Sequence, residues 1–151
     1  MSDKSIVVDA FQRSRTELII GSVEPYEGEM LAHLRTAIPD AGQEGEWVRT
    51  RKGIAVDIAE FYRILEALRK LNSVAATKAI GGRVQRNKNM EIRVYLEPFR
   101  GDVYCHVRTI YLRDDKPGKG MSVKAELLPS LIDLAEKIQK AIEARTWEEA
   151  E

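Results

Sequence analysis

Aromatic and cationic side chains alternate along two neighbouring stretches in the second half of the chain, "MEIRVYLE" at 90–97 and "DVYCHVRTIYL" at 102–112. Alternation with a period of two is typical of strands and places these side chains on one face of a sheet. Such a face could hold unpaired bases, which stack on aromatic rings for about 1–3 kcal/mol each while cations follow the phosphates. The candidate binding residues of this half are Arg93, Tyr95, Tyr104, His106, Arg108, Tyr111, Arg113, Lys116 and Lys119.

The first half contains a second version of the same pattern. The stretch "VEPYEGEMLAHLRT" at 23–36 corresponds to "LEPFRGDVYCHVRT" at 96–109 with one constant offset, which indicates an internal duplication. The candidate binding residues of the first copy are His33, Arg35, Arg49, Arg51 and Lys52. Comparable places in this copy hold acidic or aliphatic residues, namely Glu24, Glu27, Glu29 and Ile38. We therefore expect the copies to have diverged, with the second retaining more of the binding chemistry.

Each copy has the same order of expected elements. Residues 16–24 and 90–97 are rich in β-branched and aromatic side chains and predict a strand. A turn with proline and glycine, an alternating strand, a short strand opened by glycine and an amphipathic helix follow in both copies. The helices are expected at 57–71 and 127–144. The sequence thus predicts an α+β fold of two ββββα repeats, each a curved antiparallel sheet followed by one helix, packed as an intramolecular pseudo-dimer.

The repeats also predict how the chain is organised. A helix covers only one face of a sheet, so the other face meets solvent or a partner. A unit of about 60 residues is marginal alone, so we expect the two units to pack helix against helix and share a core. The expected segments are an N-terminal segment at 1–15, a first repeat at 16–72, a connector at 73–89, a second repeat at 90–145 and an acidic tail at 146–151. The connector is basic, with Arg83, Arg86 and Lys88, and part of it around "GRVQ" could extend the second sheet.

The ordered set of motifs resembles a known family. A strand, an aromatic-x-Gly turn, a strand bearing arginine, the "KPGKG" loop and an amphipathic helix resemble the single-stranded-DNA-binding domain of the transcriptional coactivator positive cofactor four. The resemblance implies a four-stranded sheet and a helix per unit, paired through the helices, with adjacent grooves that hold single-stranded DNA with little sequence preference. It also implies binding roles for Tyr26, Phe99 and Arg100. The family's next basic position is Glu29 or Asp102 here, a departure in both copies.

The main alternative is a protein-interaction module that keeps this fold and has lost nucleic-acid binding. The balance of 24 basic and 24 acidic residues and the acidic substitutions in the first copy support it. Arg35 and Arg108 would then be solvated strand residues that pair with Glu24 or Glu97. Both interpretations are open at the level of sequence.

Catalysis, metals and cofactors are not expected. The sequence has no Gly-rich phosphate loop before a helix, no paired-carboxylate signature and no nucleophile motif. Two histidines and an inward-facing Cys105 make a poor set of metal ligands, and Cys105 is expected to be a small buried hydrophobe. Trp47 could stack on a ligand or cap the core, and Trp147 is expected to be peripheral.

The composition and the absence of targeting patterns predict where in the cell the protein is found. A single cysteine excludes an internal disulfide and fits a reducing compartment. The start "MSDKSIVVDAFQ" lacks the long apolar core of a signal peptide, and no apolar run approaches the roughly 20 residues of a membrane helix. We expect a cytoplasmic protein, nuclear in a eukaryote, that binds single-stranded DNA or RNA during transcription, replication or repair, without membrane contact. A second copy of the chain or the transcription machinery are further partners to consider.

Overall fold

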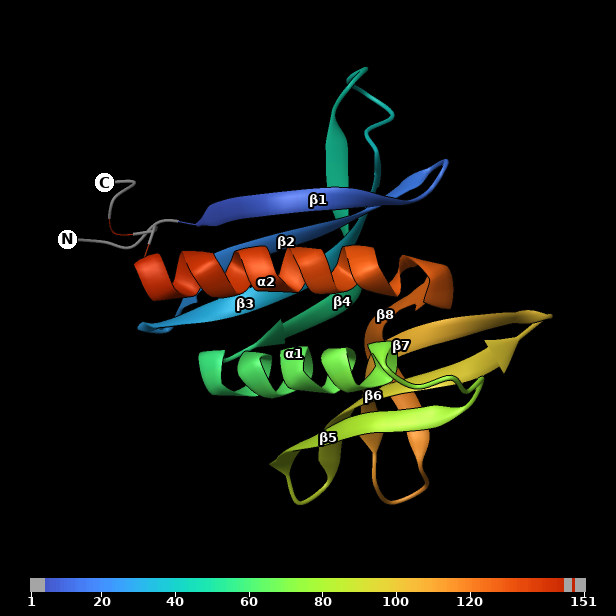
Figure 1. Cartoon of the computed structure of the whole chain (residues 1–151). Coiled ribbons are helices and arrows are strands. Elements are labelled where there is room, and N and C mark those ends of the chain that lie inside the picture. The colour runs from blue at the N-terminus through green and yellow to red at the C-terminus, as the bar shows by residue number, and fades with distance from the viewer. Residues whose placement is uncertain (1–4, 146–147, 149–151) are drawn as a thin grey trace.

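The computed structural model describes residues 5–145 and residue 148. The first repeat contains β1 (Ile6–Ser14), β2 (Glu17–Tyr26), β3 (Glu29–Pro39), β4 (Trp47–Val56) and α1 (Ile58–Asn72). The second contains β5 (Ala79–Asn87), β6 (Met90–Phe99), β7 (Asp102–Tyr111), β8 (Lys116–Lys124), a short 3-10 turn (Ala125–Leu127) and α2 (Leu128–Ala144). Strands β1–β4 form the first sheet and β5–β8 the second, both antiparallel and in sequential order (Figure 1). The predicted α+β class with two ββββα repeats is confirmed.

Both repeats begin earlier than the sequence predicts. β1 occupies the expected N-terminal segment, and β5 occupies most of the expected connector. The register shifts between Val7 and Asp9 in β1 and between Ile80 and Gly82 in β5. Such bulges interrupt the period-two alternation by which a strand is recognised. At the other end, most of the expected acidic tail, including Trp147, lies outside the described residues.

Each helix covers the sheet of the other repeat. α1 packs against β5 and β6, α2 packs against β1 and β2, and the two helices also contact each other. Figure 1 shows the helices side by side, with α2 across the first sheet and α1 beside β5. Buried residues from both repeats form one hydrophobic cluster. Because the helices are exchanged in this way, the core is shared between the repeats.

Glycines allow the exchanged helices to approach the strands closely. A Cβ on Gly21 of β2 would lie 2.7 Å from the Cδ1 atom of Ile138 in α2. A Cβ on Gly81 of β5 would lie 2.5 Å from the carbonyl oxygen of Ala67 in α1. Real Cβ atoms do not come this close to other heavy atoms, so Gly81 is required against the backbone of α1, whereas a larger residue at Gly21 would force the side chains of α2 to shift.

Ion pairs also connect the repeats across the exchange. Arg86 of β5 donates to Glu60 of α1 at 3.0 Å, and the Nζ atom of Lys137 in α2 lies 2.6 Å from Asp9 of β1. Glu60 has a second role, because it completes a capping box with Asp57 at the start of α1. Arg86 of the basic connector therefore joins β5 to the helix of the other repeat.

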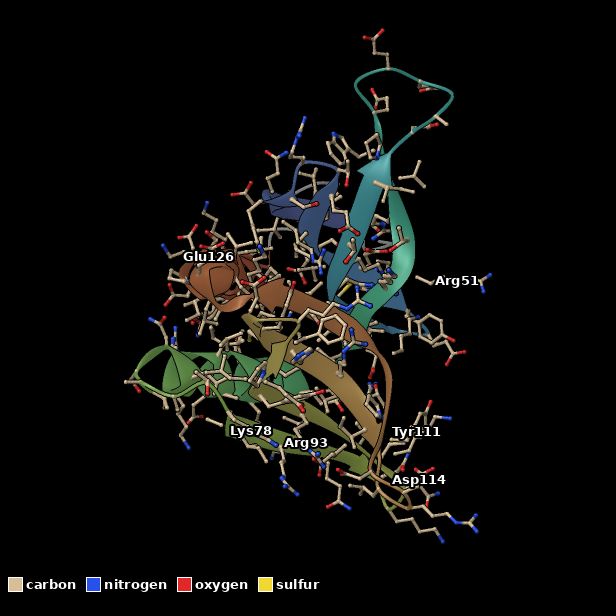
Figure 2. The ribbon with its side chains drawn as sticks, turned by 90° about the vertical axis from the view of Figure 1, so that its right-hand side faces the viewer. Arg51, Lys78, Arg93, Tyr111, Asp114 and Glu126 are labelled. Atoms are coloured by element: carbon tan, nitrogen blue, oxygen red, sulfur yellow. The ribbon has the colours of Figure 1, made fainter. Side chains whose placement is uncertain are left out.

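The face of each sheet opposite the helices, called here the outer face, carries the polar side chains. Leu34, Cys105 and Val107 are buried on the inner faces, while Arg35 and Arg108 lie on the outer faces, as the alternation predicts. Figure 2 shows the helices on one side of the molecule and Arg51 and Tyr111 projecting from the opposite side. Among the described residues, neither helix combines the length and the apolar character that crossing a bilayer requires.

Candidate nucleic-acid interface

Four rings follow one another on the outer face of the second sheet. Tyr95 stacks on His106 with centroids 4.8 Å apart and an interplanar angle of 21°. Tyr104 lies 6.2 Å from His106, and Phe99 meets Tyr104 edge to face, also at 6.2 Å. We call Tyr95, His106, Tyr104 and Phe99 the aromatic row.

Strand pairing explains the order of the row. In the antiparallel register of β6 and β7, Tyr95 is opposite His106 and Glu97 is opposite Tyr104. Side chains two residues apart on one strand share a face, so three of the rings gather from just two strands. Phe99 stands at the turn, 56% exposed, with the Arg100 guanidinium 5.1 Å from its ring centre. Arg100 is thus placed to accompany the row as a cation.

Ser122 of β8 fixes the middle of the row. Its Oγ atom lies 2.6 Å from the Nδ1 atom of His106 and accepts a hydrogen bond from Arg108 at 3.0 Å. Arg108 also donates to the carbonyl oxygen of Gly118 at 3.2 Å. A Cβ on Gly120 would lie 2.5 Å from the Cγ atom of Arg108, so this glycine lets the arginine lie flat across the sheet. Burial, followed by the charge of Arg108, lowers the pKa of His106, which keeps the imidazole neutral at pH 7.

Cations from both repeats meet where the sheets adjoin. β4 and β8 are in contact, and beside them lies a groove of about 290 Å³ that we call the cation groove. Its cationic residues are Arg13, Arg51, Lys52, Arg108 and Lys119. Glu17, the single carboxylate that lines it, forms an ion pair with Arg13. Within the described part of the chain, no ion pair neutralises Arg51, Lys52, Arg108 or Lys119.

The cation groove continues into the aromatic row. An adjoining hollow of about 330 Å³ is lined by Phe99, Tyr104 and His106, and it shares Arg13, Arg108 and Ser122 with the cation groove. Arg13 donates from its Nε atom to the carbonyl oxygen of Ser122 at 2.6 Å, which brings the first repeat against the second. Arg13 was not among the predicted binding residues, because residues 1–15 were expected to form a separate N-terminal segment.

The outer face of the first sheet is occupied by its own ion pairs. Arg49 pairs with Glu24, whose carboxylate also accepts from Ser22 at 2.6 Å. Burial alone would raise the pKa of Glu24, but the hydrogen bonds from Arg49 and Ser22 outweigh it, so this pKa is lowered. His33 lies 3.9 Å from Glu24 and accepts from Arg35 at 3.1 Å. Arg49, a predicted binding residue, is thus already engaged by a carboxylate of its own sheet.

Arg93 is likewise neutralised. It donates to Glu91 at 2.7 Å and to Asp115 at 2.9 Å, and its side chain is only 12% exposed. The hydrogen bond with Asp115, ahead of the one with Glu91, raises its pKa against the effect of burial. Arg93, a predicted binding residue, thus holds the β7–β8 hairpin against the sheet through these ion pairs.

The other predicted residues stand apart from the row. Tyr111 is 43% exposed and packs over Gly118, where an added Cβ would lie 2.6 Å from its ring. Arg113 and Lys116 are exposed at the end of the same hairpin. Tyr26 is 60% exposed at the β2–β3 turn, and within the described residues no second ring stacks on it.

Cys105 and Trp47 have no place at this interface. Cys105 is completely buried, and burial raises the pKa of its thiol to about 12. Trp47 begins β4 opposite Pro39, is 36% exposed and does not cap the core. No cluster of three or more His, Cys, Asp or Glu side chains suited to a metal ion is found among the described residues.

Comparison with known proteins adds no relative. No protein-family profile matches the chain, and no curated protein sequence matches it.

Proposed function

We propose that this protein binds a single strand of nucleic acid across the second sheet, with bases on the aromatic row and phosphates along the cation groove. The observation that carries the proposal is the continuity of the two, since Arg108 lines both hollows. Rings beside unneutralised cations are what unpaired nucleotides require. Stacking uses the faces of the bases, which all four share, so binding by the row is largely independent of sequence.

The cation groove gives the neutral chain a local attraction for a polyanion. The whole sequence has equal numbers of basic and acidic residues, so its net charge provides no general attraction. Four cations of the groove are nevertheless without an acidic partner among the described residues. Each phosphate that such a cation neutralises releases counterions, which makes affinity fall as salt rises. Binding therefore depends on a cluster of charges at the junction of the repeats.

We further propose kinship with the positive cofactor four-like family and a role where unpaired strands are exposed, in transcription, replication or repair. The turn, strand and helix motifs and their repetition support the kinship, and the fold is the one that the resemblance implies. RNA is as suitable a ligand as DNA, because stacking platforms accept either sugar.

A titration of labelled oligo-dT of about 15 nucleotides, followed by fluorescence anisotropy at two salt concentrations, tests the proposal. We expect a Kd of about 10⁻⁶–10⁻⁴ M at physiological salt. The slope of log affinity against log salt should be about −3, because roughly four phosphates are neutralised at about −0.7 each. Affinity weaker than millimolar, or independent of salt, would contradict it.

A protein-interaction role is the second candidate, favoured by the hairpin of β3 and β4. Ile38 and Val48 pair across this hairpin and are 44% and 45% exposed, with Trp47 beside them. Figure 1 shows the hairpin projecting beyond the rest of the first sheet. A second copy of the chain is the simplest occupant for such an apolar surface. This function would be established instead if the protein did not bind oligonucleotides, sedimented as a dimer, and became monomeric when Ile38→Ser was introduced.

A further inference from the structure

A carboxylate without a partner stands beside the aromatic row. Glu97 is exposed next to Tyr95, and no hydrogen bond or ion pair reaches it from the described residues. The matching residue of the first repeat, Glu24, is held by Arg49 and Ser22. A free negative charge weakens any surface that holds phosphates. An unpaired Glu97 carboxylate on a face that binds nucleic acid therefore indicates that this carboxylate contacts a group other than a phosphate.

Glu97 lines a hollow of about 470 Å³ beside strands β5 and β6, which we call the Glu97 pocket. Tyr95, Ile80 and Pro117 provide apolar walls, and Lys78 precedes β5 at its edge. Figure 2 shows Lys78 close to Arg93, which lines the same pocket. One face of the Tyr95 ring rests on His106, and Tyr95 also lines the Glu97 pocket. A planar group in the pocket would therefore lie directly beside the aromatic row.

The ion pairs of the pocket decide which polar groups are available to a ligand. Arg93 is bound by Glu91 and Asp115, which fixes the β7–β8 hairpin as one wall. Lys78 has no ion-pair partner among the described residues. The charged side chains of the pocket that have no ion-pair partner among the described residues are therefore one acceptor, the carboxylate of Glu97, and one donor, the ammonium of Lys78.

Guanine is the base whose edge matches this pair. An ionised carboxylate only accepts hydrogen bonds, and an ammonium only donates them. The Watson–Crick edge of guanine presents two adjacent N–H donors, at N1 and N2, beside the acceptor O6. Thymine would place a carbonyl oxygen on each side of its single N–H donor, against the carboxylate. Adenine and cytosine each offer only one donor group beside a ring nitrogen that repels a carboxylate.

We propose that the Glu97 pocket binds one guanine base of the strand, with Glu97 accepting from N1 and N2 and Lys78 donating to O6. The inference rests on the proposed function and adds a preference at one nucleotide to an otherwise sequence-tolerant interface. Tyr95 both lines the pocket and belongs to the aromatic row, so the guanine lies next to the bases that stack on the row.

The experiment compares two labelled strands, an oligo-dT of about 15 nucleotides and the same strand with one central dG. The dG strand should bind the wild-type protein about tenfold more tightly, the discrimination that one good bidentate contact provides. Replacing dG by deoxyinosine, which lacks the N2 amino group, should lose a large part of that preference. A single guanine also keeps the strands from pairing with each other through guanine runs.

Glu97→Gln separates base selection from general affinity. It removes a negative charge, so affinity for the dT strand should stay equal or rise, while the ratio between the two strands should fall to about one. The matched control is Glu126→Gln, because Glu126 is exposed on the helix side of the molecule and makes the same change in net charge (Figure 2). This control should keep the wild-type ratio.

The outcomes separate this inference from the proposed function. Failure to bind either strand would overturn the proposed function, and this inference with it. Binding both strands equally would overturn only the guanine pocket. A preference for dG that survives Glu97→Gln would also overturn it.

Discussion

The two sheets of this protein have the same arrangement of strands, but their outer faces differ in chemical character. His33 and Arg35 of the first sheet recur as His106 and Arg108 of the second, and both arginines lie over a glycine, Gly53 or Gly120. The first sheet uses these groups in a closed network around Glu24, whereas the second leaves Arg108 without an acidic partner. The repeated residues thus maintain the sheet, and the residues between them determine whether its face is available.

Three substitutions account for much of the difference. Ser22, Leu31 and Ile38 of the first repeat correspond, at the constant offset, to tyrosines 95, 104 and 111. A serine at the first of these positions can hydrogen-bond Glu24, as it does here, whereas a tyrosine there stacks on histidine. The same fold therefore carries a polar network in one copy and an aromatic row in the other.

Removing a ring from the row should produce the largest effect. Tyr104→Ala should weaken oligo-dT binding by about tenfold to a hundredfold, because one base loses its stacking partner. The matched change in the first sheet, Leu31→Ala, should leave affinity within about twofold. Anisotropy titrations at one salt concentration measure both, with thermal unfolding as the check on folding. Equal losses in the two variants would remove the distinction between the sheets.

The repeated arginines provide the next comparison. Arg108→Ala should weaken binding by about tenfold, since it removes a charge-assisted contact with phosphate. It should also reduce the salt dependence by about 0.7 in the log–log slope. Arg35→Ala should change both quantities less, because Arg35 is engaged with His33. A loss from Arg35→Ala as large as that from Arg108→Ala would argue for a symmetric site.

Cations of β4 test whether the first repeat contributes through the groove alone. Arg51 projects from the outer side of the molecule, whereas Arg49, two residues earlier, is paired with Glu24 (Figure 2). Arg51→Ala should weaken binding by about threefold and lower the salt slope, and Arg49→Ala should leave both nearly unchanged. The same titrations measure these variants. If only Arg49→Ala weakened binding, the nucleic acid would lie on the outer face of the first sheet.

The smallest expected effect concerns stability. Arg49→Ala should lower the free energy of unfolding at pH 7 by less than about 1 kcal/mol, because the pair is partly exposed. Hydrogen bonds hold the pKa of Glu24 below its usual value, so their contribution is present above the unfolded pKa of about 4.3 and is lost as the pH falls through the folded value. Urea unfolding should therefore show a larger difference from wild type at pH 7 than at pH 3. A difference that is equally large at pH 3 would contradict this assignment.

Much of the fold is predictable because it follows from local pattern. The alternation with a period of two predicted that His106 and Arg108 lie on one face of the sheet and Cys105 and Val107 on the other. The amphipathic stripes predicted the positions of both helices. The exchange of helices is not encoded in such a pattern, since an apolar stripe does not specify which sheet it covers. Gly21 and Gly81 were the available signal, because glycines within strands often mark a close approach.

The sequence predicted the types of residue at the site, but it did not predict which of its charged side chains form ion pairs. Arg49 and Arg93 looked free in the sequence, because their partners are brought to them only by the folded sheet. Asp115 lies 22 residues from Arg93 along the chain and reaches it because the β7–β8 hairpin bends over the sheet. Arg13 was missed for a similar reason, since only the docking of the β1–β2 hairpin on β8 brings it to the cation groove.

An NMR titration of the whole chain with oligo-dT would test the central claim most directly. The ring protons of Phe99, Tyr104 and Tyr95 should move upfield as bases stack on them, while those of Tyr26 and Trp47 should remain near their free positions. Saturating binding in which the largest shifts fall on Tyr26 or Trp47, with the aromatic row unchanged, would contradict the account.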